Sequence, residues 1–350
     1  MSDTAIEIAN VWKIFGANPL HVLNVARGGA FTKQALLEQH DAVVGVADVS
    51  LAVKRGEIFC VMGLSGSGKS TLVRHINRLL EPTAGSVIVD GVDVMSLEPP
   101  ALQTFRNHKV AMVFQNFGLL PHWSVLDNIA MPLEIRAINK NERMRIAAKI
   151  VSLVELDGWG NKFAHELSGG MQQRVGLARA LAADPDVLLM DEPFSALDPL
   201  IRRQLQDEFI KLSAKMNKTT VFITHDLDEA VRVGDRIAIM RDGAVVQIGT
   251  AEDIVMHPAD DYVADFVAGI SRLKIVKANA VMTPVAQFVH THGPLGGDLR
   301  QVPESESLSS LINMAIGDES PIAVTRAEQT VGIVTSRDIL RTVIEGADVA

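Results

Sequence analysis

The chain has 350 residues, a net charge of −9 and a single cysteine, Cys60. This length exceeds one typical domain, so one large domain and a smaller one are expected. The acidic balance argues against a nucleic-acid partner, and one cysteine excludes an internal disulfide. No signal peptide is evident at the N-terminus, and no apolar run reaches the ~18 residues of a membrane helix.

Apolar periodicity predicts alternating strands and helices along most of the chain. Strands are expected over 5–14, 44–53, 57–62, 85–91, 110–114, 186–190 and 219–224. Helices are expected over 71–80, 125–156, 166–181, 199–216 and from 228 onward. This alternation predicts an α/β fold with a mostly parallel sheet.

Two regions stand apart from this alternation. Residues 17–43 contain Gly and Pro breakers and are expected to form a surface insert, with a short helix over 35–38 capped by Thr32. From about Ser271 the pattern changes to a helix over 305–315, strands over 321–325 and 330–334, and a helix over 336–343. These elements predict a separate small α+β module over 271–350.

A phosphate-binding loop is indicated between the strand that ends at Met62 and the helix that follows it. The stretch fits G-x-x-x-x-G-K-[ST], a pattern in which glycines allow the backbone to approach phosphate closely. Lys69 would reach the β- and γ-phosphates, and the Ser70 hydroxyl would bind Mg²⁺. A nucleoside triphosphate is therefore the expected ligand, and the expected contacts are Gly63, Leu64, Ser65, Gly66, Ser67, Gly68, Lys69, Ser70 and Thr71.

Three more polar positions follow predicted strands: Gln115, Asp191 and His225. In parallel α/β sheets, ligands collect at the carboxyl ends of the strands, where these positions and the phosphate loop fall. Asp191 can hold Mg²⁺ through water, completing the metal shell that Ser70 begins. Glu192, directly beside it, is placed to orient and polarise an attacking water.

A second anion site is expected at the start of the helix over 166–181. Ser168, Gly169 and Gly170 place free N–H groups and the positive end of the helix dipole there. One nucleotide has a single γ-phosphate, so these residues are expected to serve the nucleotide that another copy holds. The sequence therefore predicts a dimer.

This segment, Leu167–Gln172, makes the chain resemble the ATPase subunit of ABC transporters, although Met171 stands where glutamine is commoner. The resemblance covers residues 5 to about 268. It implies an ABC-type nucleotide-binding domain over 1–270, with a RecA-like mixed sheet core and a helical subdomain at about 116–180. It also implies the cofactors ATP and Mg²⁺.

The resemblance assigns further roles to four residues. Gln115 would sense Mg²⁺ as a ligand of the metal and face the membrane subunit. His225 would contact the γ-phosphate as a catalytic switch beside Glu192, and Phe15 would stack on adenine. Asp198 would link the two nucleotide sites across the dimer, so that the contacts made in trans are Ser168, Gly169, Gly170 and Asp198.

The insert at 17–43 and the amino-acid sequences of 61–68 and 190–202 resemble those of the ATPases of glycine betaine/proline-type importers. This likeness implies membrane permease subunits that contact residues 115–123, a solute-binding protein, and a peripheral location on the cytoplasmic face of the inner membrane. Those ATPases carry regulatory CBS modules, which usually come in tandem. Val281–Pro284 and Gly332–Leu340 resemble the first and the last sequence segments of a single CBS module.

Two alternatives stay open. The importer could carry choline, another betaine or an amino acid, because the cargo is chosen by other subunits. The other class is a soluble ABC protein that acts on nucleic acid or ribosomes. Such proteins usually carry two cassettes, or a long coiled-coil insert, and a basic surface, whereas this chain has one cassette and a net charge of −9.

Overall fold

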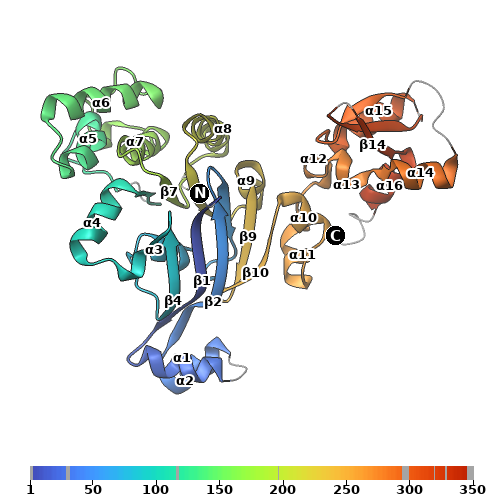
Figure 1. Ribbon diagram of the computed structural model, residues 1–350. Coiled ribbons are helices and arrows are strands. Elements are labelled where there is room, and N and C mark those ends of the chain that lie inside the picture. Colours follow the sequence, from blue (N-terminus) through green and yellow to red (C-terminus); the bar gives the residue numbers. More distant parts are fainter. Residues whose placement is uncertain are drawn as a thin grey trace. The chain divides into compact units, whose positions relative to one another are not determined.

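The computed structural model describes residues 3–28, 32–115, 118–195, 197–293, 299–318, 320–327 and 329–344. The chain forms two compact units, Met1–Ile248 and Gly249–Ala350 (Figure 1). Among the described residues, no helix combines the length and the apolar character needed to cross a bilayer.

A six-stranded sheet forms the centre of the first unit, in the order β10-β9-β3-β8-β7-β6. Its members are β3 (Ile58–Met62), β6 (Val110–Val113), β7 (Val187–Asp191), β8 (Thr219–Thr224), β9 (Arg236–Arg241) and β10 (Ala244–Gly249). The strands from β9 to β6 pair in parallel. Every residue of β3, β7 and β8 is buried, which explains their continuous apolar runs.

The N-terminal strands form a second sheet, which corrects the prediction of one mostly parallel sheet. The order is β2-β1-β4-β5, and each neighbouring pair is antiparallel. Its members are β1 (Thr4–Phe15), β2 (Val43–Lys54), β4 (Ala84–Val89) and β5 (Val92–Asp93). Much of β2 alternates buried and exposed positions, as expected of an antiparallel strand with one face on the core. One hydrophobic cluster joins the two sheets through α3 (Lys69–Ile76).

The insert between β1 and β2 contains two helices, α1 (Pro19–Arg27) and α2 (Lys33–His40). The predicted cap is confirmed, because the Thr32 hydroxyl accepts a hydrogen bond from the Ala35 amide at 3.1 Å. The insert has its own hydrophobic cluster, in which Val22 and Leu36 pack with Trp12 of β1. Figure 1 shows it at one end of the first unit.

The helical part of the first unit lies at the opposite end from the insert (Figure 1). It consists of α5 (Val125–Ile135), α6 (Lys140–Leu153) and α7 (Gly169–Ala182), which share one hydrophobic cluster. The sequence predicted one helical stretch over 125–156. Instead the chain turns at Ala137, which has a φ of 56°, and Asn139 caps the next helix. The other helices of this unit are α4 (Pro99–His108), α8 (Pro199–Met216) and α9 (Leu227–Val233).

The second unit is an α+β module around a sheet of order β11-β14-β13-β12. The predicted helices and strands after residue 300 are confirmed as α15, β13, β14 and α16. The helices α10 and α11, which the sequence placed with the first domain, fall in this unit. Its elements are α10 (Ala251–Met256), α11 (Asp261–Val267), α12 (Arg272–Ile275), α13 (Ala278–Val281), β11 (Thr283–Pro284), α14 (Val285–His292), β12 (Gln301–Pro303), α15 (Leu308–Gly317), β13 (Ile322–Arg326), β14 (Gln329–Val334) and α16 (Ser336–Ile344).

Candidate nucleotide site

The parallel strands end in register at one edge of the central sheet. Met62 pairs with Thr224 and Asp191 with Ile223, so the ends of β3, β8 and β7 are level. Val113 pairs with Met190, which places the end of β6 at the same edge. The phosphate loop, Gln115, Asp191 and His225 all follow these ends. The structure thus brings together positions that are far apart in the sequence.

The phosphate loop requires glycine at two positions for steric reasons. Gly63 and Gly68 have φ values of 148° and 98°, which side chains of L-residues rarely adopt. A Cβ on Gly63 would also collide with the carbonyl oxygen of Met240, and one on Gly68 with that of Gly45. The loop is therefore packed tightly against neighbouring backbone, and its N–H groups are held close together at the start of α3.

Lys69 lies buried inside this loop. Its ammonium group donates to the carbonyl oxygens of Gly63 at 2.7 Å and Leu64 at 3.0 Å. Burial lowers the pKa of Lys69, while the negative charges of Glu192 and Asp191 oppose this shift. An ammonium group has three protons to donate, so one remains for a phosphate oxygen.

Ser70 and Asp191 form a cluster of oxygen atoms beside the loop. The Ser70 hydroxyl donates to Asp191 Oδ1 at 2.7 Å, and Arg74 contacts the other carboxylate oxygen at 3.3 Å. Within the described residues, no group of three or more His, Cys, Asp or Glu side chains could hold a metal. Two oxygen ligands fit Mg²⁺, because this ion usually completes its shell with waters and substrate phosphates.

Glu192 and His225 form an acid–imidazole pair at the same edge. Glu192 Oε2 lies 3.0 Å from His225 Nδ1. The backbone of Glu192 has a φ of 47°, and its amide donates to the Ile223 carbonyl oxygen at 3.1 Å. The Glu192 side chain is 20% exposed and that of His225 is 57% exposed. In this backbone conformation the Glu192 carboxylate lies beside His225, which follows the end of β8, and both side chains stay partly exposed to solvent.

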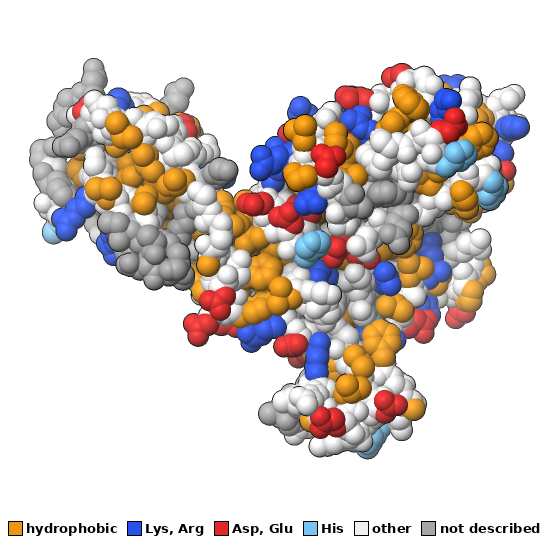
Figure 2. All heavy atoms as spheres, turned by 180° about the vertical axis from the view of Figure 1, so that it is seen from behind, with side chains coloured by type: hydrophobic (Ala, Val, Ile, Leu, Met, Phe, Trp, Pro, Cys, Tyr) orange, Lys and Arg blue, Asp and Glu red, His pale blue; other side chains and the backbone are white. Residues whose placement is uncertain are grey.

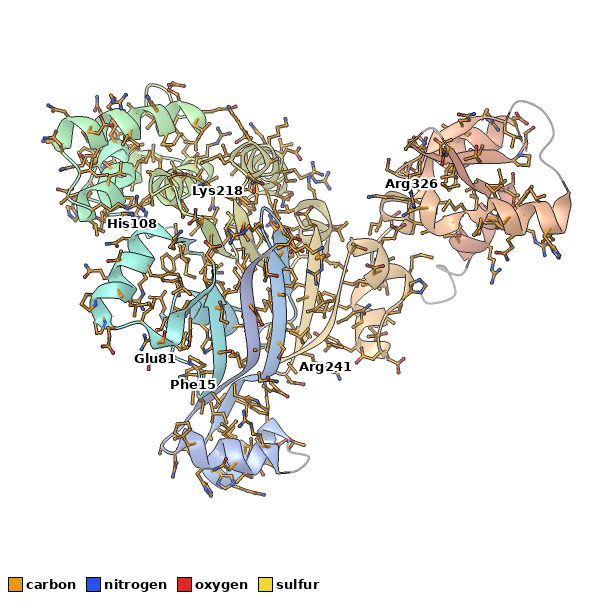
Figure 3. All side chains as sticks on the ribbon, viewed as in Figure 1. Phe15, Glu81, His108, Lys218, Arg241 and Arg326 are labelled. Atoms are coloured by element: carbon orange, nitrogen blue, oxygen red, sulfur yellow. The ribbon has the colours of Figure 1, made fainter. Side chains whose placement is uncertain are left out.

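Phe15 is an exposed aromatic residue near the phosphate loop, at the end of β1 next to the insert (Figure 3). The Lys13 ammonium lies 5.1 Å from the centre of its ring. A Cβ built on Gly45 would meet both the Phe15 ring and the Thr71 methyl group. The ring therefore lies beside the first turn of α3, with a face available for stacking.

The residues predicted to act in trans gather in a different place. Ser168 caps α7 by accepting from the Met171 amide at 3.4 Å, and Asp198 caps α8 by accepting from two amides at 3.1 Å. Both caps line one hollow of about 620 Å³, together with Gly169 and Gly170. The residues that line this hollow include none from the phosphate loop. The hollow around Ser168 and Asp198 is therefore separate from the phosphate loop of the same chain.

Gln115 is exposed after β6, and the loop that follows it is partly fixed by α5. The Asn128 side chain accepts a hydrogen bond from the Leu120 amide and donates to the carbonyl oxygens of Leu120 and Trp123. Asn116 and Phe117 of the predicted permease contact lie outside the described residues. The rest of the contact, 118–123, is therefore presented in a defined conformation.

Sequence reasoning missed two residues of this site. Arg74 lies four residues after Ser70 on α3, so helical spacing could have shown that it reaches Asp191. Gly45 lies on β2, and its carbonyl oxygen closes the loop around Gly68. That contact depends on how the two sheets pack, so no local pattern signals it.

Comparison with known proteins identifies the family. The model of the ABC transporter family matches residues 46–195. The glycine betaine/proline betaine transport system ATP-binding protein ProV of Escherichia coli (strain K12) is 52% identical over 276 residues, which cover 79% of this chain and 69% of ProV. The trimethylamine N-oxide transport system ATP-binding protein TmoW of Pelagibacter ubique is 44% identical over 345 residues, 98% of each chain.

A solved structure shows the same fold. It is a dimeric ATP-binding cassette in a post-hydrolysis state, bound to ADP and Pi. The two chains are 32% identical with a TM-score of 0.59, and the likeness covers 70% of this chain and 98% of the other. The polar residues at the strand ends, the sequence identity and the fold all point to the same family. This chain belongs to the ABC transporter family as one of its ATP-binding proteins.

Proposed function

We propose that this chain hydrolyses ATP to drive an importer of glycine betaine or another quaternary amine. Support comes from ProV and from the glycine betaine/carnitine transport ATP-binding protein GbuA of Listeria monocytogenes, which is 45% identical over 341 residues. The full-length similarity to TmoW points to solutes of the same kind, small molecules with a methylated nitrogen. Choline or an amino acid remains the alternative cargo.

The observation that carries the mechanism is the separation of the two half-sites. The phosphate loop lies at the edge of the parallel sheet, whereas Ser168 and Asp198 line a hollow that this loop does not reach. Two chains facing head to tail would place ATP between the loop of one copy and the hollow of the other. The dimeric structure of the similar cassette supports this arrangement.

Within each nucleotide site, the chain's own residues divide the work. Lys69 and the loop amides would bind the phosphates, and Phe15 would stack on the base. Ser70, Asp191 and Gln115 would hold Mg²⁺, which supplies positive charge next to the β- and γ-phosphates. Glu192 would accept a proton from the attacking water, and general-base catalysis of this kind contributes 10²–10⁴-fold.

His225 would keep Glu192 oriented and contact the γ-phosphate. The Glu192–His225 distance of 3.0 Å supports a hydrogen bond between them. Contacts that exist only in the closed dimer would drive its closure, since a swing from 1:99 to 99:1 takes about 5.5 kcal/mol of differential binding. Hydrolysis removes the γ-phosphate that both copies hold, and the dimer reopens.

The segment from Gln115 to Trp123, in which Gln115 and His122 are exposed, is the proposed contact with the permease, which would hold the ATPase on the cytoplasmic face of the inner membrane. A solute-binding protein would deliver the cargo to the permease. The relatives described above are all ATP-binding proteins of transport systems, which favours this reading over action on nucleic acid or ribosomes. Stimulation of the ATPase by nucleic acid would contradict it.

We further propose that residues 271–350 form one CBS-like regulatory module within the second unit, which follows the ATP-binding domain along the chain. The two segments that resemble a CBS module reach adjacent strands, because Thr283 pairs with Ile333 and Pro284 with Gly332. Ile316 and Leu340 are 80% and 59% exposed. This exposed apolar surface supports pairing with the same module of a second copy.

The cargo is tested by transport into vesicles that contain the chain with its permease and solute-binding protein. We expect ATP-dependent uptake of glycine betaine, competed by other methylated amines but not by amino acids. Vesicles with Glu192→Gln provide the matched control and should show no uptake. Uptake of an amino acid in preference to glycine betaine would overturn the cargo assignment.

A further inference from the structure

A cavity of about 200 Å³ lies between α6, α7 and α8, and the nucleotide chemistry makes no use of it. Its walls are mostly apolar: Leu177 comes from α7, Phe194 precedes α8, and Leu205, Phe209 and Leu212 follow one face of α8 at helical spacing. A cavity of about 150 Å³ can hold a benzene ring. This one therefore has room for an apolar group somewhat larger than benzene.

The wall of this cavity also contains an unsatisfied amide. Gln173 is 1% exposed, and neither its Nε2 nor its Oε1 has a hydrogen-bond partner among the described residues. A polar group that is buried without a hydrogen-bond partner has a free-energy cost. Gln173 lies one turn before Leu177 on α7 and lines the cavity with it. A ligand atom able to bond to an amide would remove this cost.

The cavity lining has a small net positive charge, because its three basic residues, Arg174, Lys211 and Lys215, outnumber its two carboxylates, Glu155 and Glu208. Lys211 and Lys215 line it from successive turns of α8, both are exposed, and neither forms a salt bridge within the part of the chain that the structure describes. Arg174, in contrast, is neutralised by Glu155 at 3.2 Å and Glu208 at 2.8 Å. Two lysines without carboxylate partners favour an anionic group at the mouth.

We propose that this cavity binds a small amphipathic carboxylate with a hydrogen-bonding group at its far end. The carboxylate would pair with Lys211 and Lys215, the apolar chain would lie among the leucine and phenylalanine side chains, and the far group would bond to Gln173. Arg174 and Glu155 line both this cavity and the hollow around Ser168. The ligand would therefore contact residues that shape the proposed trans half-site, and this regulatory aspect rests on the proposed function.

Binding is tested on the full chain by isothermal titration calorimetry with ω-hydroxy carboxylates from butanoate to decanoate. We expect saturable binding with an optimum in the middle of the series. The ω-hydroxy compound should bind more tightly than the simple carboxylate of the same length, and Gln173→Leu should reverse this preference. The double variant Lys211→Ala/Lys215→Ala should lower the affinity for carboxylates by about three- to tenfold but leave the affinity for octanol unchanged.

Two controls make the result decisive. Leu205→Trp fills the cavity and should lower affinity more than about tenfold, and Leu212→Phe at its half-buried edge replaces it if the first variant does not fold. Arg203→Ala, exposed on the same helix but outside the cavity, should bind as the parent does. Absence of saturable binding across the series, or binding that survives cavity filling, would overturn the proposal. Neither outcome depends on ATP hydrolysis, so the proposed function would be unaffected.

Discussion

His75 shows how a single buried side chain connects the phosphate-loop helix to stability. It is fully buried on α3, where its Nδ1 lies 3.3 Å from the Leu72 carbonyl oxygen. Its Nε2 has no hydrogen-bond partner among the described residues. Burial lowers the pKa of His75 to about 4, with the Leu72 carbonyl opposing this shift. The neutral imidazole is therefore the form that folds.

This pKa predicts a loss of stability in mild acid. The unfolded chain binds a proton at His75 near pH 6.5 and the folded chain only near pH 4, so stability falls as pH drops below 6.5 and levels off below 4. Between about pH 7.5 and about pH 5.5 the loss from this residue is about 1.3 kcal/mol. Chemical denaturation of the parent and of His75→Leu at both pH values should show a smaller loss in the variant. Equal losses would contradict the assignment.

Among the secondary-structure elements, the sequence predicted those that are specified by residues close together in the chain. The phosphate loop, the strand ends and the α2 cap depend on neighbouring residues, and the structure has them where they were expected. The helix α1 was missed although Asn18 caps it and Pro19 occupies its first position, which are recognisable start signals. The separate antiparallel sheet could not be predicted, because it depends on β1 pairing with both β2 and the distant β4.

The same distinction holds for the nucleotide site. Asp191 and Glu192 could be predicted because a buried parallel strand ends just there. The approach of the Gly45 carbonyl to Gly68 could not, since it joins a strand of the antiparallel sheet to the loop that follows β3. The strands β9 and β10 were also missed, although β9 lies beside β3 at the centre of the sheet. Contacts between distant segments set the approach of Gly45, whereas the Asp242-Gly243 turn between two apolar runs was a local signal for β9 and β10 that went unused.

The cap of α2 gives a prediction at this scale. Thr32→Ala removes the hydroxyl that accepts from the Ala35 amide, and loss of such a cap costs about 1 kcal/mol. Because α2 has only eight residues, the effect should be concentrated there. Hydrogen exchange of the amides over 35–40 should become about fivefold faster. Thr32→Ser keeps the hydroxyl and should exchange like the parent; similar rates in all three proteins would show that the cap contributes nothing.

At the scale of the whole molecule, the surface charge and the hollow around Ser168 indicate which kind of partner the chain binds. On the face shown in Figure 2, acidic and basic side chains are interspersed, which fits the net charge of −9 and offers no continuous basic surface for nucleic acid. The hollow instead combines two helix N-termini, those of α7 and α8, with the small residues Gly169 and Gly170. Helix N-termini attract phosphate, which is consistent with our proposal that a nucleotide held by a second copy occupies this hollow.

Dimerisation should therefore require both ATP and this hollow. Glu192→Gln should lower turnover by about 10²–10⁴-fold and, with MgATP, accumulate as a dimer in sedimentation experiments. Adding Ser168→Arg to this variant places a bulky side chain at the rim of the hollow and should abolish the dimer, while ATP binding to the monomer stays within about twofold, because the phosphate loop lies elsewhere.

The matched control for that double variant is Ser96→Arg in the same background. Ser96 is an exposed serine outside the hollow, so its replacement adds the same charge and bulk without touching the half-site. This control should dimerise with MgATP as Glu192→Gln alone does. Dimers that persist with Ser168→Arg would mean that the hollow does not receive the nucleotide of a second copy. Loss of ATP binding in the monomer would instead place Ser168 in the same site as Lys69, against the separation of the two half-sites.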